Sequence, residues 1–477
     1  MIPVIDRAVL ALDETIAAPL FRQIRDRIAG AVLDGRLAPG ARLPSARSLA
    51  AQLSIARGTV DAAYQLLAGE GYIVARGAAG TRVDPGLDRR LLKPARSLRL
   101  APALPLVERL PGRGLPLFRM GVPALDLFPY KLWSRLIARR ARALGAADHA
   151  YQSPVGDPGL REQIARYLAV ARGVSCDPAQ IVITGGYQGA LGLITRVLMK
   201  PGEAAWVEHP GYRNAHDALR IAGMRLVGVP VDAEGFDIAW ALSKARPARI
   251  AFVTPTHQYP LGITLSLQRR MALLQWAEME DGWIVEDDYD SEFRYHGKPL
   301  PALKSLDRRE RVLYAGTFSK VLSPGLRVGY LVVPAGLVSR FAEVAQSLQP
   351  PPTLLVQDAI AEFIEQGHFA RHIRRMRQLY AERRSALADA LAEEAPQLEI
   401  ALKPGGMHLL AWLPRGTDDV KLVARLSDAG MAPAPLSING VERPYAPGLV
   451  IGFTNIDANK ARQAARALAS ALTAARR

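Results

Sequence analysis

A lysine in the second half of the chain stands where its amine could act as a nucleophile. The segment TFSK at 317–320 places Lys320 directly after the β-rich run RVLYAG and before SPGLRVGY. An amine at such a junction can form a Schiff base with an aldehyde cofactor. Thr317, Ser319 and Arg327 offer hydroxyl and guanidinium donors to a phosphate on the same cofactor.

A group of carboxylates lies at the end of another β-rich run, GWIVEDD at 282–288, and just beyond it. In EDDYDSEF, we assign Asp287 as the counter-ion of a protonated pyridine nitrogen, because a carboxylate at the carboxyl end of a strand suits that role. Tyr289 is then the donor to the phenolic oxygen of the same ring. A solvated loop is one alternative. A metal site made by Glu286, Asp287, Asp288 and Asp290 is another, which we set aside because this group holds no histidine.

A glycine-rich turn is a second candidate for phosphate binding. In ITGGYQGAL at 183–191 it joins a strand to a helix, so backbone N–H groups at the helix N-terminus can bind a phosphate. The candidates are Gly186, Tyr187 and Gln188. Turns of this kind also serve simply to connect elements, so the motif is ambiguous by itself.

Two further segments contribute rings. HPGYRNA at 209–215 offers Tyr212 as a flat wall for a cofactor ring, and TPTHQYPLG at 254–262 offers His257 and Tyr259 near its phenolic oxygen. Each is ambiguous alone. Because all these pieces fall at junctions between strands and helices, together they predict one pocket for pyridoxal phosphate.

The N-terminal quarter carries a different pattern. Periodic apolar residues predict helices over 19–34, 45–53 and 57–69, the second of them beginning at the cap signal of Ser45. The alternation over 72–83 predicts a small β-wing. Three helices and a wing make a winged helix-turn-helix.

Basic residues flank the turn between the second and third of these helices. A solvated basic face is the plain interpretation, but this position favours contact with the major groove of DNA. Asp61 is unusual there. It could accept a hydrogen bond from cytosine N4, but we favour an interpretation in which it faces solvent or pairs with Arg57. The DNA-binding residues we assign are Ser45, Arg47, Arg57, Thr59 and Arg76.

Length and composition fit a chain of several folded domains. At about 150 residues per domain, 477 residues suggest roughly three. The content of 49% hydrophobic and 22% charged residues excludes a disordered chain. A net charge of +16, densest in residues 1–115, favours a polyanionic partner.

Cysteine usage and the N-terminus bear on the compartment. Cys176 is the one cysteine, so an intramolecular disulfide is impossible and we expect an inert thiol in the cytoplasm. Asp6, Asp13 and Glu14 interrupt what would be the apolar part of a signal peptide. No uncharged apolar run reaches about 18 residues, so we expect no membrane span.

The chain divides by composition into three parts. We expect a DNA-binding domain over 1–83, a linker over 84–115 that is rich in proline and arginine, and an effector domain over 116–477. In the last part helical stretches alternate with β-rich runs, which predicts an α/β fold with a mainly parallel sheet.

Both folded parts resemble known families. PLFRQI, PGARLPSARSLA and RGTVDAAYQLLAGEGY, within 18–83, resemble the GntR family of bacterial transcriptional regulators. Residues 118–470 resemble fold-type I aminotransferases, in segments such as FRMGVPALDLFPYKLW, GVSCDPAQIVITGGYQGAL, HQYPLG, EDDYDSEFRYHG and TFSKVLSPGLRVGY. The combination resembles the MocR/GabR group of regulators.

This resemblance implies a winged helix-turn-helix joined to an aminotransferase-like domain, with a mainly parallel seven-stranded sheet in its large part and a small C-terminal α+β part. It implies pyridoxal 5'-phosphate bound as a Schiff base to Lys320. It also implies direct-repeat operators in double-stranded DNA and a head-to-tail homodimer in which each DNA-binding module packs on the partner's aminotransferase-like domain.

The leading hypothesis is therefore a regulator that senses pyridoxal phosphate itself, or an amine or amino-acid effector that exchanges with Lys320. The rival is a metabolic aminotransferase with an accessory DNA-binding domain. A GntR regulator whose large domain is a dead scaffold is disfavoured because Lys320, Asp287 and Arg327 are retained.

One position departs from the aminotransferase pattern. Enzymes of this fold usually carry an arginine for the substrate carboxylate in a late strand, where PGLVIGF here has Val450. Valine cannot replace a bidentate guanidinium contact. Either Arg213 or Arg443 supplies it, or full turnover is lost, so we expect little or no steady-state transamination.

Overall fold

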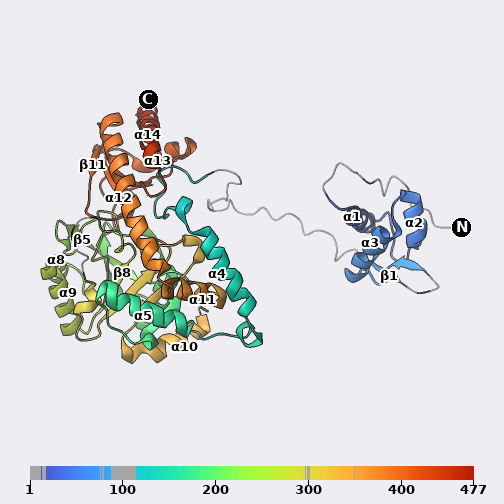
Figure 1. The fold of residues 1–477 in the computed structure, drawn as a ribbon, viewed down its shortest axis with the longest axis horizontal. Helices are drawn as coiled ribbons and strands as arrows, with labels where there is room; N and C mark the ends of the chain where they lie inside the picture. The colour runs from blue at the N-terminus through green and yellow to red at the C-terminus, as the bar shows by residue number, and fades with distance from the viewer. Residues whose placement is uncertain are drawn as a thin grey trace. The chain divides into compact units, whose positions relative to one another are not determined.

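The structure is a computed structural model of the 477-residue chain, and it divides into two compact units, Met1–Pro111 and Gly112–Arg477 (Figure 1). Residues 88–113 of the expected linker, and Arg76, lie outside the residues that it describes. Within the described part, no helix is both long enough and apolar enough to cross a membrane. The residues described are 12, 18–75, 77, 80–87, 114–295, 297, 301–348 and 350–476.

The first unit is a winged helix-turn-helix, as its sequence predicts. Ile24 and Ile28 of the first helix are fully buried against Val60 and Leu67 of the third, because the four-residue spacing places them on one face. The Ser45 hydroxyl caps the second helix by accepting the N–H of Ser48. The elements are α1 (Leu20–Leu33), α2 (Ala46–Leu53), α3 (Arg57–Gly69) and the antiparallel pair β1 (Ile73–Ala75) and β2 (Thr81–Val83).

The second unit is built on a central sheet of eight strands among the described residues, in the order β3-β10-β9-β8-β7-β4-β5-β6. Seven strands were expected. The eighth, β6, is a two-residue strand that pairs antiparallel with β5 at the edge. The strands are β3 (Ile181–Thr184), β4 (Ala204–His209), β5 (Arg225–Asp232), β6 (Gly235–Phe236), β7 (Ile250–Val253), β8 (Trp283–Asp288), β9 (Val312–Thr317) and β10 (Gly329–Val332).

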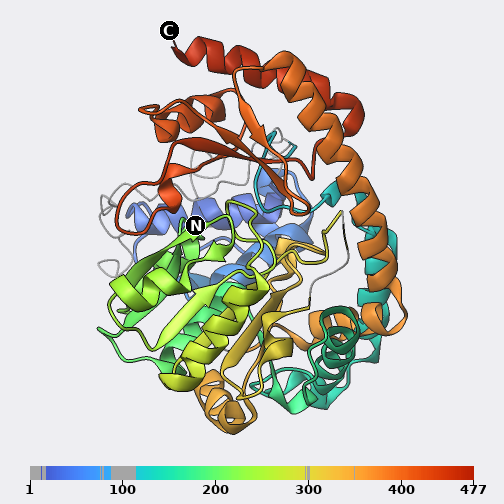
Figure 2. The same ribbon diagram turned by 90° about the vertical axis from the view of Figure 1, so that its left-hand side faces the viewer.

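Helices cover both faces of this sheet (Figure 2). Successive residues of a strand point to opposite faces, so Ile284 of β8 packs with Leu273 of α9 whereas Val285 packs with Ile194 of α6. Burial on both sides explains why these strands read as continuous apolar runs. The helices of the large domain are α4 (Tyr130–Ala143), α5 (Pro158–Arg172), α6 (Tyr187–Leu198), α7 (Arg213–Ile221), α8 (Ile238–Lys244), α9 (Leu267–Met279), α10 (Val338–Leu348) and α11 (Leu354–Glu365).

A smaller α+β domain follows, and the long helix α12 runs from the large domain into it (Figure 2). Its antiparallel sheet has the order β11-β12-β14-β13. Its elements are α12 (His368–Glu394), β11 (Glu399–Ala401), β12 (His408–Trp412), α13 (Asp419–Asp428), β13 (Ala434–Pro435), β14 (Gly448–Gly452) and α14 (Ala461–Arg476).

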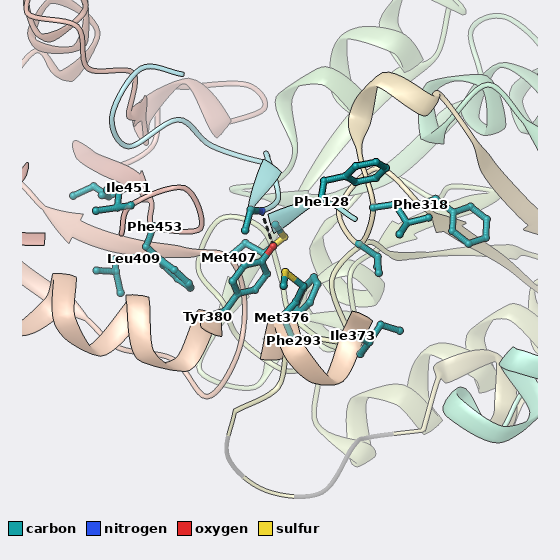
Figure 3. Packing of buried hydrophobic residues seen from close by; sticks show 14 of the residues in the cluster. Phe128, Phe293, Phe318, Ile373, Met376, Tyr380, Met407, Leu409, Ile451 and Phe453 are labelled. Carbon is teal, nitrogen blue, oxygen red and sulfur yellow. Dashed lines mark hydrogen bonds between the residues drawn. The ribbon is translucent and has the colours of Figure 1, made fainter. Parts of the chain in front are cut away.

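One apolar cluster joins the two domains (Figure 3). Phe293 of the large domain packs against Tyr380 of α12, with ring centroids 4.8 Å apart, and Tyr380 in turn meets Phe453 beyond β14. The Tyr380 hydroxyl accepts the buried backbone N–H of Ala124 at 2.8 Å. The chain before α4 is thereby fixed to α12.

We expect Tyr380→Phe to lower the free energy of unfolding of the second unit by about 1–3 kcal/mol, because the Ala124 N–H would stay buried without an acceptor. Urea unfolding followed by tryptophan fluorescence measures this, since every tryptophan of the chain follows residue 112. Tyr130→Phe, at a mostly exposed ring, is the matched control and should change little. Equal effects of the two variants would contradict the assigned role of this hydrogen bond.

Candidate functional site

The predicted site residues gather at one edge of the central sheet. The strands β9, β8, β7, β4 and β5 are mutually parallel, and β3 has the same direction because β10 runs antiparallel to both β3 and β9. Their carboxyl ends therefore share an edge, which is where open α/β sheets bind ligands.

A pocket of about 440 Å³ opens at this edge, within the roughly 300–1,000 Å³ of small-molecule sites. The predicted cofactor residues that line it are Tyr187, Gln188, Tyr212, Asp287, Tyr289, Thr317, Ser319, Lys320 and Arg327. The other lining residues are Met120, Gly121, Arg213, Asn214, Tyr259, Pro324, Met407, His408, Ala434, Ile438 and Asn439.

Lys320 follows β9, and its amine donates to the carbonyl oxygen of Gly121 at 2.8 Å. Burial lowers the pKa of this amine below its ordinary value, while Asp290 and Asp287 act in the opposite direction. Gly121 has φ +72°, and a Cβ at this position would lie 2.6 Å from the lysine Nζ. A glycine is therefore needed here, and the buried amine is kept nearer to its nucleophilic neutral form.

Asp287 lies at the end of β8, and its carboxyl group is buried. Burial raises its pKa well above the ordinary value, and the negative charges of Asp288, Glu208 and Asp290 raise it further. A cation placed against Asp287 would offset this cost, and a protonated pyridine nitrogen is such a cation. The carboxyl group thus fits the predicted counter-ion role.

The donors for a phosphate lie together on the other side of the pocket. Helix α6 begins after Gly186, at φ +85°, and has no side-chain cap, so its first N–H groups are open to an anion. Arg327 reaches this turn by donating to the carbonyl oxygen of Gly185 at 3.0 Å. With the hydroxyls of Thr317 and Ser319 in the same lining, the donor set suits a phosphate.

Aromatic rings form the walls between these groups. Tyr212 lies 6.5 Å from Tyr187, with the ring planes tilted by 33°. Tyr259 meets Tyr212 edge-on at 5.6 Å and Tyr289 edge-on at 6.5 Å. The walls and donors together fit a flat, phosphorylated, protonated ring.

Two predicted cofactor residues take positions outside the lining. Gly186 lies at the base of α6, where a Cβ would come within 3.6 Å of the Arg327 guanidinium. His257 lies behind Tyr289, with its Nδ1 3.1 Å from the tyrosine hydroxyl oxygen. The sequence analysis expected His257 near the phenolic oxygen of the cofactor ring. In the structure Tyr289 lines the pocket there, and His257 contacts Tyr289.

The structure separates the two arginines proposed as substitutes at Val450. Val450 is 0% exposed in the small-domain sheet, packed with Leu410 and Leu436. Arg213, the first residue of α7, lines the pocket with a half-exposed side chain, its Nε 3.4 Å from Asp217. Arg443 does not line it, so the geometry favours Arg213 for a carboxylate.

The neighbouring acids have structural partners. Glu286 accepts the N–H groups of Leu303 and Lys304, both at 2.8 Å, and Asp288 forms a buried ion pair with Arg172 at 2.7 Å. Across the described residues, no group of three or more histidine, cysteine or acidic side chains is arranged to hold a metal ion. Burial raises the pKa of the Cys176 thiol to about 11, which keeps it in its unreactive form.

The sequence analysis did not find the pocket residues that the small domain and the segment around Gly121 contribute. Met407 precedes β12 and His408 begins it, and Ile438 and Asn439 follow β13, in segments that read as ordinary apolar strands and turns. Gly121 had one usable signal, a glycine in the motif FRMGVPALDLF, but its contact with Lys320 spans 199 positions of the chain.

On the first unit, a separate hollow of about 1,000 Å³ lies between α2, α3 and the wing. Ser45, Arg57 and Asp61 line it together with Arg42, which the sequence analysis did not single out. Asp61 pairs with Arg57 at 3.3 Å, in line with the favoured interpretation. Arg47 is exposed on α2 and Thr59 is half-buried in the first turn of α3. Arg76 lies outside the described residues.

Comparisons with known proteins cover both units. Residues 129–468 match the family described as aminotransferase class I and II, and residues 20–83 match the gntR family of bacterial regulatory proteins. The chain is 38% identical over 98% of its length, and 96% of the relative, to the probable rhizopine catabolism regulatory protein MocR of Rhizobium meliloti. It is 33% identical over 91% of its length, and 92% of the relative, to the pyridoxine biosynthesis transcriptional regulator PdxR of Corynebacterium glutamicum.

Among solved structures, the chain is similar to the alpha-aminoadipate aminotransferase LysN of Thermus thermophilus, complexed with N-(5'-phosphopyridoxyl)-L-leucine. The two share 30% identity with a TM-score of 0.70, over 76% of this chain and 93% of that one.

We expect Gly121→Ala to reduce covalent capture of pyridoxal phosphate at Lys320, because alanine rarely adopts φ +72° and its methyl group, 2.6 Å from the lysine Nζ, would force the amine to shift. Borohydride reduction followed by peptide mapping measures the capture. Gly336→Ala, where a Cβ meets nothing within 4 Å, is the matched control and should be labelled like the wild type, whereas Lys320→Ala should carry no label. Label on another lysine in the wild type would refute the assignment.

Proposed function

This chain belongs to the MocR-type regulators, in which a gntR-family segment is joined to a class I and II aminotransferase segment, and from that premise we propose how its pocket governs its binding to DNA. It is a DNA-binding transcriptional regulator whose cofactor is pyridoxal phosphate. The observation that carries the proposal is a pocket that keeps the buried amine of Lys320 and the counter-ion Asp287, while an apolar core residue, Val450, replaces the usual carboxylate clamp.

Each part of the pocket has a task in this proposal. When bound, pyridoxal phosphate supplies an aldehyde carbon that either a lysine or a free amine can occupy. Lys320 would hold this position in the absence of another amine, and its lowered pKa favours the neutral form that such an exchange needs. Asp287 would hold the ring by its nitrogen, and Arg327 with the start of α6 would hold the phosphate.

The effector is then pyridoxal phosphate itself, or an amine or amino acid that takes the place of Lys320. Among the described residues that line the pocket, Arg213 is the cation outside the phosphate and lysine positions. It would receive the carboxylate of an amino acid, from the large-domain side rather than from the small-domain strand that holds Val450. Its ion pair with Asp217 is exposed and therefore weak, so exchanging partners costs little.

We also propose that the protein acts in the cytoplasm, where bacterial promoter DNA lies, as a head-to-tail homodimer. The exposed tyrosines Tyr130 and Tyr151 of the second unit are available for such an association, since tyrosine is enriched at protein interfaces. A dimer also joins two DNA-binding modules on one operator, which strengthens binding without any new type of contact.

The rival function, a metabolic aminotransferase, needs rapid turnover. Without a clamp on the small domain, an amino acid is held but poorly oriented for repeated proton transfer. We therefore expect added amines and amino acids to displace Lys320, as seen by a change in the visible spectrum, with negligible steady-state transamination. Turnover on the order of 1 per second or faster would instead support the enzyme.

The Arg213 assignment has its own discriminating variant. Arg213→Gln should weaken the binding of amino acids about tenfold or more, because a charge-assisted hydrogen bond is lost. Amines that lack a carboxylate serve as the internal control and should bind the variant like the wild type. Equal weakening of both ligand classes would remove Arg213 from the carboxylate role.

For DNA, we expect Arg47→Ala and Arg57→Ala each to cost about 1–3 kcal/mol of binding free energy in fluorescence anisotropy at two salt concentrations. Arg340→Ala, which removes an exposed arginine from α10, is the matched control and should bind like the wild type.

Asp61→Ala separates two roles of this residue. A relaxed sequence preference indicates base contact, and an equal gain in affinity for all sequences indicates phosphate repulsion. Unchanged affinity in both arginine variants would contradict the placement of α3 in the groove.

A further inference from the structure

A histidine that does not reach the pocket lies directly behind one of its walls. The Nδ1 atom of His257 is 3.1 Å from the hydroxyl oxygen of Tyr289 and 3.1 Å from Oδ2 of Asp290. Both His257, at 7% exposed, and Asp290, at 2%, are buried. A phenol, an imidazole and a carboxylate are thus assembled around one nitrogen atom.

The carboxylate decides which atom carries the proton. Oδ2 of Asp290 lies 3.1 Å from Nδ1 and has no hydrogen-bond partner among the described residues, so its negative charge favours the tautomer that carries a hydrogen on Nδ1. In that tautomer the N–H donates to the Tyr289 oxygen, which acts as the acceptor. The hydroxyl hydrogen of Tyr289 is left to point elsewhere, and this side chain lines the pocket.

The phenol keeps this hydrogen at neutral pH. Burial raises the pKa of Tyr289 well above its ordinary value, and the nearby charges of Asp290 and Asp287 raise it further. Tyr289 is therefore a hydrogen-bond donor toward the pocket.

The imidazole ring is fixed from both domains. A Cβ on Gly406 of the small domain would overlap the ring, and one on Gly262 would come within 3.0 Å of Nε2. His408 of β12 lies 5.6 Å away, measured between ring centroids. In this packing Nδ1 is the ring atom that contacts the Tyr289 hydroxyl.

The far side of the ring makes no hydrogen bond within the described part of the chain. Nε2 faces a cavity of about 10 Å³ lined also by Ser291 and Arg294, and within the described part of the chain no protein atom hydrogen-bonds to it. A space of this size holds at most one water molecule. The titratable or charged groups that face His257 are therefore Tyr289, Asp290, Arg294 and His408.

We propose that His257 is a positioning residue: together with Asp290 it holds the Tyr289 hydroxyl as a donor aimed at the phenolic oxygen of the cofactor. This inference rests on the proposed function insofar as pyridoxal phosphate occupies the pocket. The sequence analysis placed His257 in direct contact with the cofactor. In this proposal His257 instead orients Tyr289, and Tyr289 makes the contact.

The spectrum of the bound cofactor reports this action. A hydrogen bond to the phenolic oxygen favours its negative form, so it lowers the pH at which the visible absorption of the bound cofactor titrates. We expect His257→Phe to raise the midpoint of that titration in the full-length, cofactor-loaded protein by roughly half a pH unit to one unit. His257→Asn, whose amide nitrogen lies near the position of Nδ1, should restore most of the wild-type midpoint.

A double variant distinguishes positioning from general packing. Tyr289→Phe should raise the midpoint at least as far as His257→Phe, and adding His257→Phe to it should produce no further shift. Asp290→Asn removes the charge but keeps the size of the side chain, and it leaves His257 in place. It therefore tests the orientation of Tyr289 by His257 and Asp290 if His257→Phe fails to fold. It should shift the midpoint in the same direction.

Two results would overturn the inference. One is a wild-type midpoint in both His257→Phe and Asp290→Asn, and the other is a shift from His257→Phe that persists undiminished in the Tyr289→Phe protein. A wild-type protein with no visible band and no borohydride label at Lys320 would instead overturn the proposed function and this inference together.

Discussion

Buried negative charge at the end of β8 is the constraint on which the pocket of the second unit depends. Asp287 lies at the end of β8 with its pKa raised well above the ordinary value by burial and by the charges of Asp288, Glu208 and Asp290. The guanidinium of Arg172 pairs with Asp288 rather than with Asp287. A ligand that brings a cation to Asp287 would offset the free energy that burial has cost, which favours a protonated ring over a neutral one in this pocket. Asp287 and Asp290 also act on the Lys320 amine, since their charges oppose the lowering of its pKa by burial.

The parallel sheet brings this charge to the other groups. Strands with a common direction end at a common edge, so an acid at the end of β8, a lysine after β9 and a helix start after β3 meet although their sequence positions are far apart. Glycines then permit the backbone at two places. Gly121, at φ +72°, lets the Lys320 amine reach its carbonyl oxygen, and Gly186, at φ +85°, lets the turn before α6 adopt a conformation that other residues rarely take.

Much of this arrangement could be predicted from the sequence, because buried strands and helix starts leave local signals. The runs before Tyr187, Asp287 and Lys320 marked the strand ends correctly, and the winged helix-turn-helix followed from helical spacing and a serine cap. Other features depend on contacts that no local pattern encodes. The small-domain lining lies on strands with ordinary apolar patterns, the two-residue β6 is too short to give a periodic signal, and the choice between Arg213 and Arg443 required knowing which side chain reaches the pocket. The place of His257 behind Tyr289 is of the same kind, because it is set by glycines of both domains.

The charge of the pocket is unevenly divided between the two domains, and this division bears on regulation. Among the described lining residues the cations Arg213, Lys320 and Arg327 all belong to the large domain, whereas the small domain contributes Met407, His408, Ala434, Ile438 and Asn439. Burial lowers the pKa of His408 to about 3, so this wall is uncharged at neutral pH. An effector bound here would therefore be fixed by charge from one side only, and the small domain would meet it through shape and neutral hydrogen bonds. Such contacts depend on the part of the effector that lies beyond its amine and carboxylate, so the small domain can respond to which compound is bound rather than merely to whether the lysine has been displaced.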